Sequence, residues 1–152
     1  MSDTHALVRP ELFGALAGVE LILHAGDVGG QSVLDELRAI APVHAVYGNV
    51  DPAGDPHLAA RLDLDLGGLM VHVSHGHELG APTPEKLLAR YDADVIIFGH
   101  THQAVIHRAG PRLVVNPGAA GPRRFNVHPS IARLTIANHH AEAEIIPLGG
   151  QV

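Results

Sequence analysis

The chain has 152 residues, of which 46% are hydrophobic and 17% charged, and its formal net charge is −6 with histidine neutral. This acidic balance disfavours an extended nucleic-acid surface, and 3% aromatic residues without Trp disfavour a base-stacking platform. The lack of Cys excludes disulfides and thiolate metal sites, and no apolar run reaches membrane-spanning length. We therefore expect one cytoplasmic domain over residues 1–152, without a membrane partner.

The first half of the chain alternates helix and strand patterns. A short helix follows Pro10, and then come a strand at 19–24, a helix at 31–40 and a strand at 43–47. Residues 62–66 alternate Leu and Asp, and Gly67-Gly68 turns the chain into a return strand at 69–74. A helix at 84–90 precedes an apolar strand at 94–98.

The second half consists of hairpins, predicted at 104–107 with 112–115 and at 131–136 with 141–146. Alternating elements followed by hairpins indicate an α/β fold. We expect two mixed β-sheets packed as a sandwich and flanked by helices.

Polar side chains with metal-ligand chemistry follow these strands repeatedly. A buried polar group needs a partner, and a metal ion would supply one at the sheet edge where α/β folds place their sites. Gly precedes several of these residues and would let the backbone turn sharply. The candidate ligands are Asp3, His5, Asp27, Asn49, His75, His100 and His102.

Two of these histidines, His100 and His102, are separated by one residue. In extended backbone such residues project to the same side, so we expect the pair to form half of a metal site.

Seven candidate ligands are too many for one tetrahedral ion, so the count indicates two ions with a bridging carboxylate. Nitrogen and oxygen ligands without sulfur suit Mn²⁺, Fe²⁺, Zn²⁺, Ni²⁺ or Co²⁺ better than Ca²⁺ or Mg²⁺, and we place Mn²⁺ first. Two such ions are the arrangement for hydrolysing phosphate esters.

The same residues carry a resemblance to the calcineurin-like metallophosphoesterases, and most closely to their small YfcE-like bacterial and archaeal phosphodiesterase branch. The shared motifs lie in the family's order from residue 2 to about residue 124. They are Asp3-Thr4-His5, Gly26-Asp27, Gly48-Asn49-Val50-Asp51, His75-Gly76-His77, Gly99-His100-Thr101-His102 and Asn116-Pro117-Gly118 followed by Pro122-Arg123.

The resemblance implies a role for each candidate ligand. One ion would be held by Asp3, His5 and His102, and Asp27 would bridge to the second. That second ion would be held by Asn49, His75 and His100. A hydroxide bridging the two ions would attack the phosphorus of a small phosphodiester.

Three further residues receive roles beside the metal ligands. Larger relatives have a proton-donating His where this chain has Val50, so we assign leaving-group protonation to His77, with a metal-bound water as the alternative. Asp51 would orient a ligand, and Arg123 would meet a phosphate oxygen unless it is a solvated surface residue.

The beginning of the chain departs from the family pattern. Relatives carry an apolar strand before the first motif, whereas this chain has only Met1 there. Either the assigned start lies downstream of the real one, or the fold lacks an inner strand. In the second case we expect Asp3 and His5 to be poorly anchored and the first metal site to be weak or empty.

Two other functions stay open. One is a non-catalytic interaction scaffold, because the retromer scaffold subunit shares this fold and uses it to bind partners. The other is a phosphomonoesterase or nuclease using the same site, although the net charge disfavours a large nucleic-acid surface. Oligomerisation is also left open.

Overall fold

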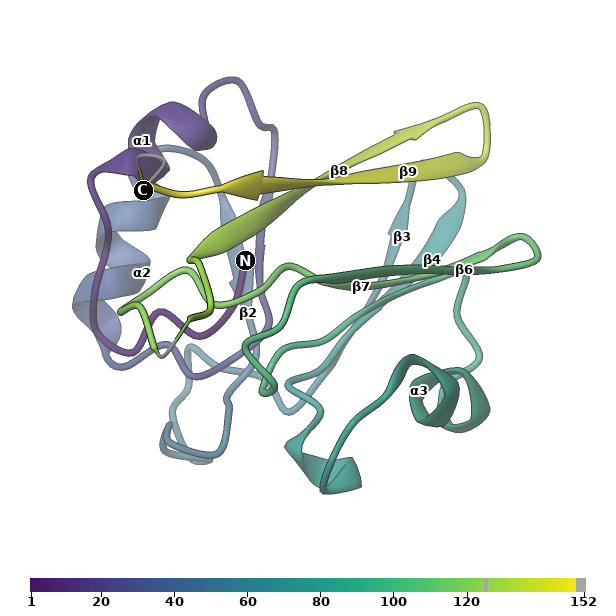
Figure 1. The fold of residues 1–152 in the computed structure, drawn as a ribbon, viewed down its shortest axis with the longest axis horizontal. Helices are drawn as coiled ribbons and strands as arrows, with labels where there is room; N and C mark the ends of the chain where they lie inside the picture. The colour runs from purple at the N-terminus through teal and green to yellow at the C-terminus, as the bar shows by residue number, and fades with distance from the viewer. Residues whose placement is uncertain (125, 150–152) are drawn as a thin grey trace.

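A mixed five-stranded sheet forms the larger layer of the fold (Figure 1). The computed structural model describes residues 1–124 and 126–149. The strand order is β3-β4-β5-β7-β6, with parallel pairing of β5 to β4 and β7 and antiparallel hairpins at both edges. The strands are β3 (Leu62–Leu66), β4 (Leu69–Val73), β5 (Val95–Ile97), β6 (Val105–Ala109) and β7 (Arg112–Asn116). β5 lies at the centre of the sheet, where side chains on both faces are buried, and its apolar sequence suits this position.

The facing layer is divided into two pairs of strands. β1 (Ile22–His24) and β2 (Val43–Ala45) are parallel, and β8 (Ser130–Ala137) and β9 (His140–Pro147) are antiparallel. Leu23 and Leu134 both pack against the hydrophobic cluster that contains Val71 and Val95 of the five-stranded sheet, so both pairs cover the same face. The predicted α/β fold is confirmed, but the second layer consists of two separate small sheets.

Helices cover both outer faces. α1 (Glu11–Ala15) and α2 (Gln31–Arg38) pack outside β1 and β2, and α2 buries Val33, Leu34 and Leu37 as its spacing predicts. α3 (Pro84–Arg90) lies on the opposite side of the five-stranded sheet (Figure 1), where Leu87 packs on Ile96. A short 3₁₀ helix, η1 (His77–Leu79), is a feature that the sequence pattern does not predict. Within the described residues, every helix is too short or too polar to cross a membrane.

A cavity of about 780 Å³ separates the two small sheets. Its walls include Leu21, Leu23 of β1, residues 131–136 of β8, and Ile97 and Val115 of the five-stranded sheet. Residues 19–21 border this cavity instead of a neighbouring strand, which explains why β1 begins at Ile22 and not at the predicted residue 19.

The expectation that Asp3 and His5 are poorly anchored is wrong for this structure. The Asp3 and His5 amides donate to the carbonyls of Gly26 and Asp27 at 2.9 and 3.0 Å, and Gly121 N donates to the Asp3 carbonyl. Asp3 is fully buried. These backbone bonds therefore anchor Asp3 and His5 to the residues that follow β1.

Candidate metal centre

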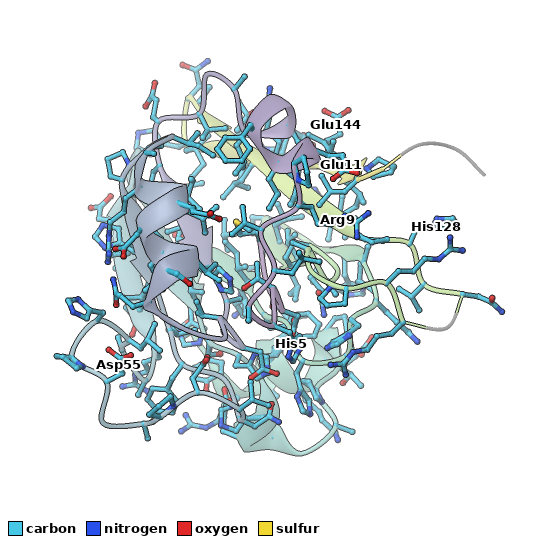
Figure 2. All side chains as sticks on the ribbon, turned by 90° about the vertical axis from the view of Figure 1, so that its left-hand side faces the viewer. His5, Arg9, Glu11, Asp55, His128 and Glu144 are labelled. Carbon is cyan, nitrogen blue, oxygen red and sulfur yellow. The ribbon has the colours of Figure 1, made fainter. Side chains whose placement is uncertain are left out.

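The candidate ligands converge at one edge of the fold, because the strands that precede them end there. Asp27 follows β1, Asn49 follows β2, His75 follows β4 and the His100–His102 turn follows β5. In Figure 2, His5 lies in the lower half of the view, well below Glu11 and Glu144.

One group of ligands forms around the Asp3 carboxylate. Asp3 Oδ1 lies 3.3 Å from His102 Nε2 and 3.7 Å from His5 Nε2. The two histidine Nε2 atoms are 3.4 Å apart, and His5 Nε2 is 3.6 Å from Asp27 Oδ2. Among the described residues, Asp3 Oδ1 is a buried oxygen without a hydrogen-bond partner. A cation between these atoms would satisfy it.

A second group forms around Asn49. His75 Nδ1 lies 2.8 Å from the Ala25 carbonyl, so it donates there and leaves the Nε2 lone pair free. That Nε2 lies 3.0 Å from Asn49 Oδ1 and 3.3 Å from Asp27 Oδ2, and His100 Nδ1 lies 3.1 Å from the same Asn49 oxygen. With neutral imidazoles and this amide orientation, lone pairs face one another, which favours a bound cation.

The carboxylates and imidazoles of the centre shift one another's pKa values. Burial alone would raise the pKa of Asp3, but the imidazoles of His102, His5 and His75 outweigh it and hold that pKa well below its ordinary value. Burial opposes protonation of His75, but the hydrogen bond that its protonated ring donates to Asp27 and the charges of Asp3 and Asp27 raise the pKa of His75 overall. Burial, followed by the charge of His75, lowers the pKa of His100. The site thus combines two ionised carboxylates with imidazoles, a donor set suited to divalent transition metals.

The backbone is strained at the candidate ligands. Asp3, His5, Asp27, His100 and His102 all have φ between 44° and 71°, the left-handed region that costs a non-glycine residue about 1–2 kcal/mol. Such strain persists where the surroundings enforce it, and it is concentrated at functional sites.

The expected extended pairing of His100 and His102 is wrong. Both residues are left-handed, with Thr101 N bonded to the Gly99 carbonyl at 2.8 Å. His100 consequently faces Asn49, while His102 faces Asp3. The two histidines belong to different ligand groups and do not form one half-site.

Gly26, directly before Asp27, has the positive φ of 102° expected of a turn, but two other glycines beside the ligands are required for space. A Cβ on Gly48 would collide with the Asp27 carboxylate, and a Cβ on Gly99 would collide with Ser2 and Asp3. Neither glycine has a positive φ. The sequence suggested sharp turns at these positions, whereas the structure shows close approach of two loops.

Asp51 ties two of the ligand loops together. Its carboxylate accepts hydrogen bonds from Val28 N, Gly29 N and Gly48 N at 2.9–3.0 Å. These bonds hold the loop after Asp27 against the loop before Asn49. This geometry suits the positioning role predicted for Asp51.

Asn116 is a positioning residue to which the sequence prediction assigned no role. Its amide donates to the Gly99 carbonyl at 3.1 Å and to Thr101 Oγ1 at 2.9 Å, and its oxygen accepts from Gly118 N at 2.9 Å. These bonds hold the turn that carries His100 and His102. The signal available in the sequence was an Asn-Pro-Gly sequence directly after an apolar strand.

His77 and Arg123 are placed differently from each other. The His77 ring centroid lies 5.3 Å from that of His75 and 6.3 Å from that of His100, and its buried Nδ1 has no hydrogen-bond partner among the described residues. Arg123 is exposed and makes no hydrogen bond or ion pair within that part of the chain. His77 is therefore brought to the second ligand group, while the role predicted for Arg123 stays a prediction.

Comparisons with known proteins agree with this geometry. Residues 1–139 match the family model described as the calcineurin-like phosphoesterase superfamily domain. A probable metallophosphoesterase of Methanothermobacter thermautotrophicus is 36% identical over 162 aligned positions, covering 100% of this chain and 92% of the relative. Phosphodiesterase YfcE of Escherichia coli K12 is 33% identical over 129 positions, covering 72% of this chain and 68% of that protein. The crystal structure of Entamoeba histolytica Vps29 complexed with Zn²⁺ has a TM-score of 0.75 at 25% identity, covering 96% of both chains. The chain belongs to the calcineurin-like phosphoesterase superfamily.

Proposed function

We propose that the protein is a dimetal phosphodiesterase that hydrolyses small phosphate diesters. The observation that carries this proposal is the convergence of unpaired acceptors: the orphaned Asp3 Oδ1, and the His75 Nε2 lone pair that faces Asn49 Oδ1. Both acceptors lie against the Asp27 carboxylate or the histidines around it. A pair of divalent cations would neutralise this cluster.

The residues present fit two ions with Asp27 between them. Asp3, His5 and His102 would hold one, and Asn49, His75 and His100 would hold the other. When bound, such ions acidify a water molecule and neutralise charge on a phosphoryl oxygen. Asp51 and Asn116 would keep the loops in place, and His77 would give a proton to the departing oxygen.

The relatives support the choice of substrate class. The Escherichia coli relative is named a phosphodiesterase, and the Vps29 structure contains Zn²⁺. The absence of thiolates and the mixture of imidazole, carboxylate and amide donors suit Mn²⁺, Fe²⁺, Zn²⁺, Ni²⁺ or Co²⁺, of which we propose Mn²⁺ as the first to test.

Removal of His100 is expected to abolish metal-dependent turnover. The substrate is bis(p-nitrophenyl) phosphate, offered to metal-stripped protein with and without Mn²⁺. We expect turnover only with Mn²⁺, and a fall of more than ~10²-fold in His100→Ala, since even residues that merely support a ligand contribute ~10–100-fold.

His44→Ala is the matched control, because His44 is an exposed histidine on β2. Equal losses in both variants would count against the assignment of His100. Faster hydrolysis of p-nitrophenyl phosphate than of the diester would favour a phosphomonoesterase. Absence of turnover with every divalent ion would favour an interaction scaffold.

Substitution of His77 is expected to act on the leaving group. His77→Ala should only modestly slow the release of p-nitrophenolate from an alkyl p-nitrophenyl diester, since that anion needs little protonation. Departure of an alkoxide should slow by ~10²–10⁴-fold. Parallel assays on diesters of graded leaving-group pKa measure this; a uniform loss across the series would assign protonation to water instead.

A further inference from the structure

A chain of polar side chains runs through the strands next to His75. His72 Nδ1 lies 3.0 Å from Asp63 Oδ1, and His72 Nε2 lies 2.9 Å from Ser74 Oγ. Because Asp63 can only accept, Nδ1 donates to it, and Nε2 of the neutral ring accepts from the Ser74 hydroxyl. Burial, although opposed by Asp63, lowers the pKa of His72, in agreement with a neutral ring. Ser74 is 2% exposed, so this arrangement does not present a nucleophile to a substrate.

A second set of bonds lies on the other side of the same ring. The Tyr91 hydroxyl, at the end of α3, donates to Glu78 Oε1 at 2.8 Å, and Gly76 N donates to Glu78 Oε2 at 3.0 Å. The Tyr91 ring stacks on His72 with centroids 3.7 Å apart and an interplanar angle of 23°. The stacked rings of His72 and Tyr91 therefore connect the two sets of hydrogen bonds.

The network holds both chain neighbours of the candidate ligand His75. The Ser74 side chain is fixed through His72, and the Gly76 backbone is fixed through Glu78. We infer that Asp63, His72, Ser74, Glu78 and Tyr91 form a positioning network that aims His75 at the metal centre. This inference rests on the proposed function.

Packing alone does not account for this network. Buried polar groups cost free energy unless they are bonded, so apolar side chains would fill β4 more simply. A satisfied polar network instead fixes the orientation of the groups it contains. Gly76 is left-handed at φ 102°, and a Cβ there would lie 3.0 Å from Pro82, so this position requires glycine. Glycine has wide conformational freedom, and the bond from Gly76 N to Glu78 restrains it.

Tyr91→Phe tests the inference because it removes one hydroxyl and keeps the ring stacked on His72. The backbone bonds Ser74 N to Ile97 O and Gly99 N to His75 O remain, so the loop should stay folded. Calorimetric titration with Mn²⁺ should show affinity weakened about tenfold. In the metal-free protein, proton exchange at His75 Nδ1–H, followed by NMR, should be faster than in the unchanged chain.

Thr83→Ala is the matched control. Thr83 caps α3 through Lys86 N at 3.2 Å, so its loss loosens the helix that carries Tyr91 without breaking a bond of the network. Faster exchange of the His75 Nδ1–H proton in Tyr91→Phe but not in Thr83→Ala supports the inference. That result would stand even if no variant bound Mn²⁺ and the proposed function failed. Equal exchange in Tyr91→Phe and the unchanged chain overturns it, as does an equal change in both variants.

Discussion

Addition of saturating Mn²⁺ to the metal-free protein is expected to raise its melting temperature by about 8–16 °C. A ligand that binds only the folded state at a thousand times its dissociation constant stabilises by about 4 kcal/mol. For a chain of this size, each kcal/mol corresponds to about 2–4 °C. The rise should be large because the cation would bind the orphaned Asp3 Oδ1 and the neighbouring Asp27 carboxylate.

The rise in melting temperature should shrink as the pH falls from 8 to 6. The pKa of His75 in the folded, metal-free protein is raised, so at lower pH this imidazole carries a proton that a metal ion must displace. In the metal-free state the raised pKa of His75 has the opposite effect, because it makes the folded protein more stable as the pH falls. The stability from His75 protonation is fully present below its unfolded pKa of about 6.5 and is lost as the pH rises through the raised folded value. Scanning calorimetry with and without Mn²⁺ over this range measures both effects.

Asp27→Asn should remove most of this metal-induced stabilisation. Asp27 Oδ2 lies 3.6 Å from His5 Nε2 and 3.3 Å from His75 Nε2, one histidine from each ligand group. An amide there cannot supply the charge that a bridging ligand provides. The matched control is Asp35→Asn, since Asp35 is an exposed carboxylate on α2. A full Mn²⁺-induced shift in Asp27→Asn would contradict the bridging role.

The sequence predicted the element order and the edge at which the ligands meet, because both follow from patterns along the chain. The Leu/Asp alternation of residues 62–66 specified β3, and polar residues a short distance after β1, β2, β4 and β5 specified the shared edge. Parallel strands bring their carboxyl ends together whatever the details of the loops.

Local backbone conformation could not be predicted in the same way. The left-handed geometry of His100 and His102 is enforced by contacts from elsewhere, including the bonds of Asn116 to Gly99 O and Thr101 Oγ1. A propensity for extended backbone is a weak preference that such tertiary contacts override. The carboxylate of Asp51 bonded to three amides and the stacking of His72 on Tyr91 likewise join residues that sequence spacing does not connect.

An engineered apolar strand placed before Met1 is expected to stabilise the protein by filling the cavity between β1 and β8. Met1 already pairs in parallel with β1, since its amine donates to the Leu23 carbonyl at 2.9 Å and its own carbonyl accepts from Ala25 N at 2.9 Å. Residues added before Met1 would continue along that edge, at about 3.3 Å per residue. Five residues, such as Met-Lys-Val-Val-Ile, would reach past Leu21 and join the two small sheets into one.

A rise in melting temperature is expected, because the added Val and Ile side chains would be buried in the cavity. Each kcal/mol of added stability corresponds to about 2–4 °C for a chain of this size. Burial also lowers the pKa of the Met1 amine, against the opposing charge of Asp3, to about 5 from 8.0. The folded protein therefore loses stability as the pH falls from 8 towards 5, because the amine binds a proton more readily in the unfolded chain. Conversion of the amine to a peptide N–H removes that loss.

A Met-Lys-Gly-Ser-Gly extension of equal length is the matched control, because it replaces the amine with a peptide bond but adds no apolar side chain. Calorimetry and hydrogen exchange at the Leu23 amide should separate the two extensions. If the apolar extension forms a strand, the Leu23 amide gains a partner and exchanges more slowly, and the melting temperature exceeds that of the control. Equal melting temperatures and equal exchange in the two extended chains would show that the cavity does not accept a strand, and that the divided layer is stable as two sheets.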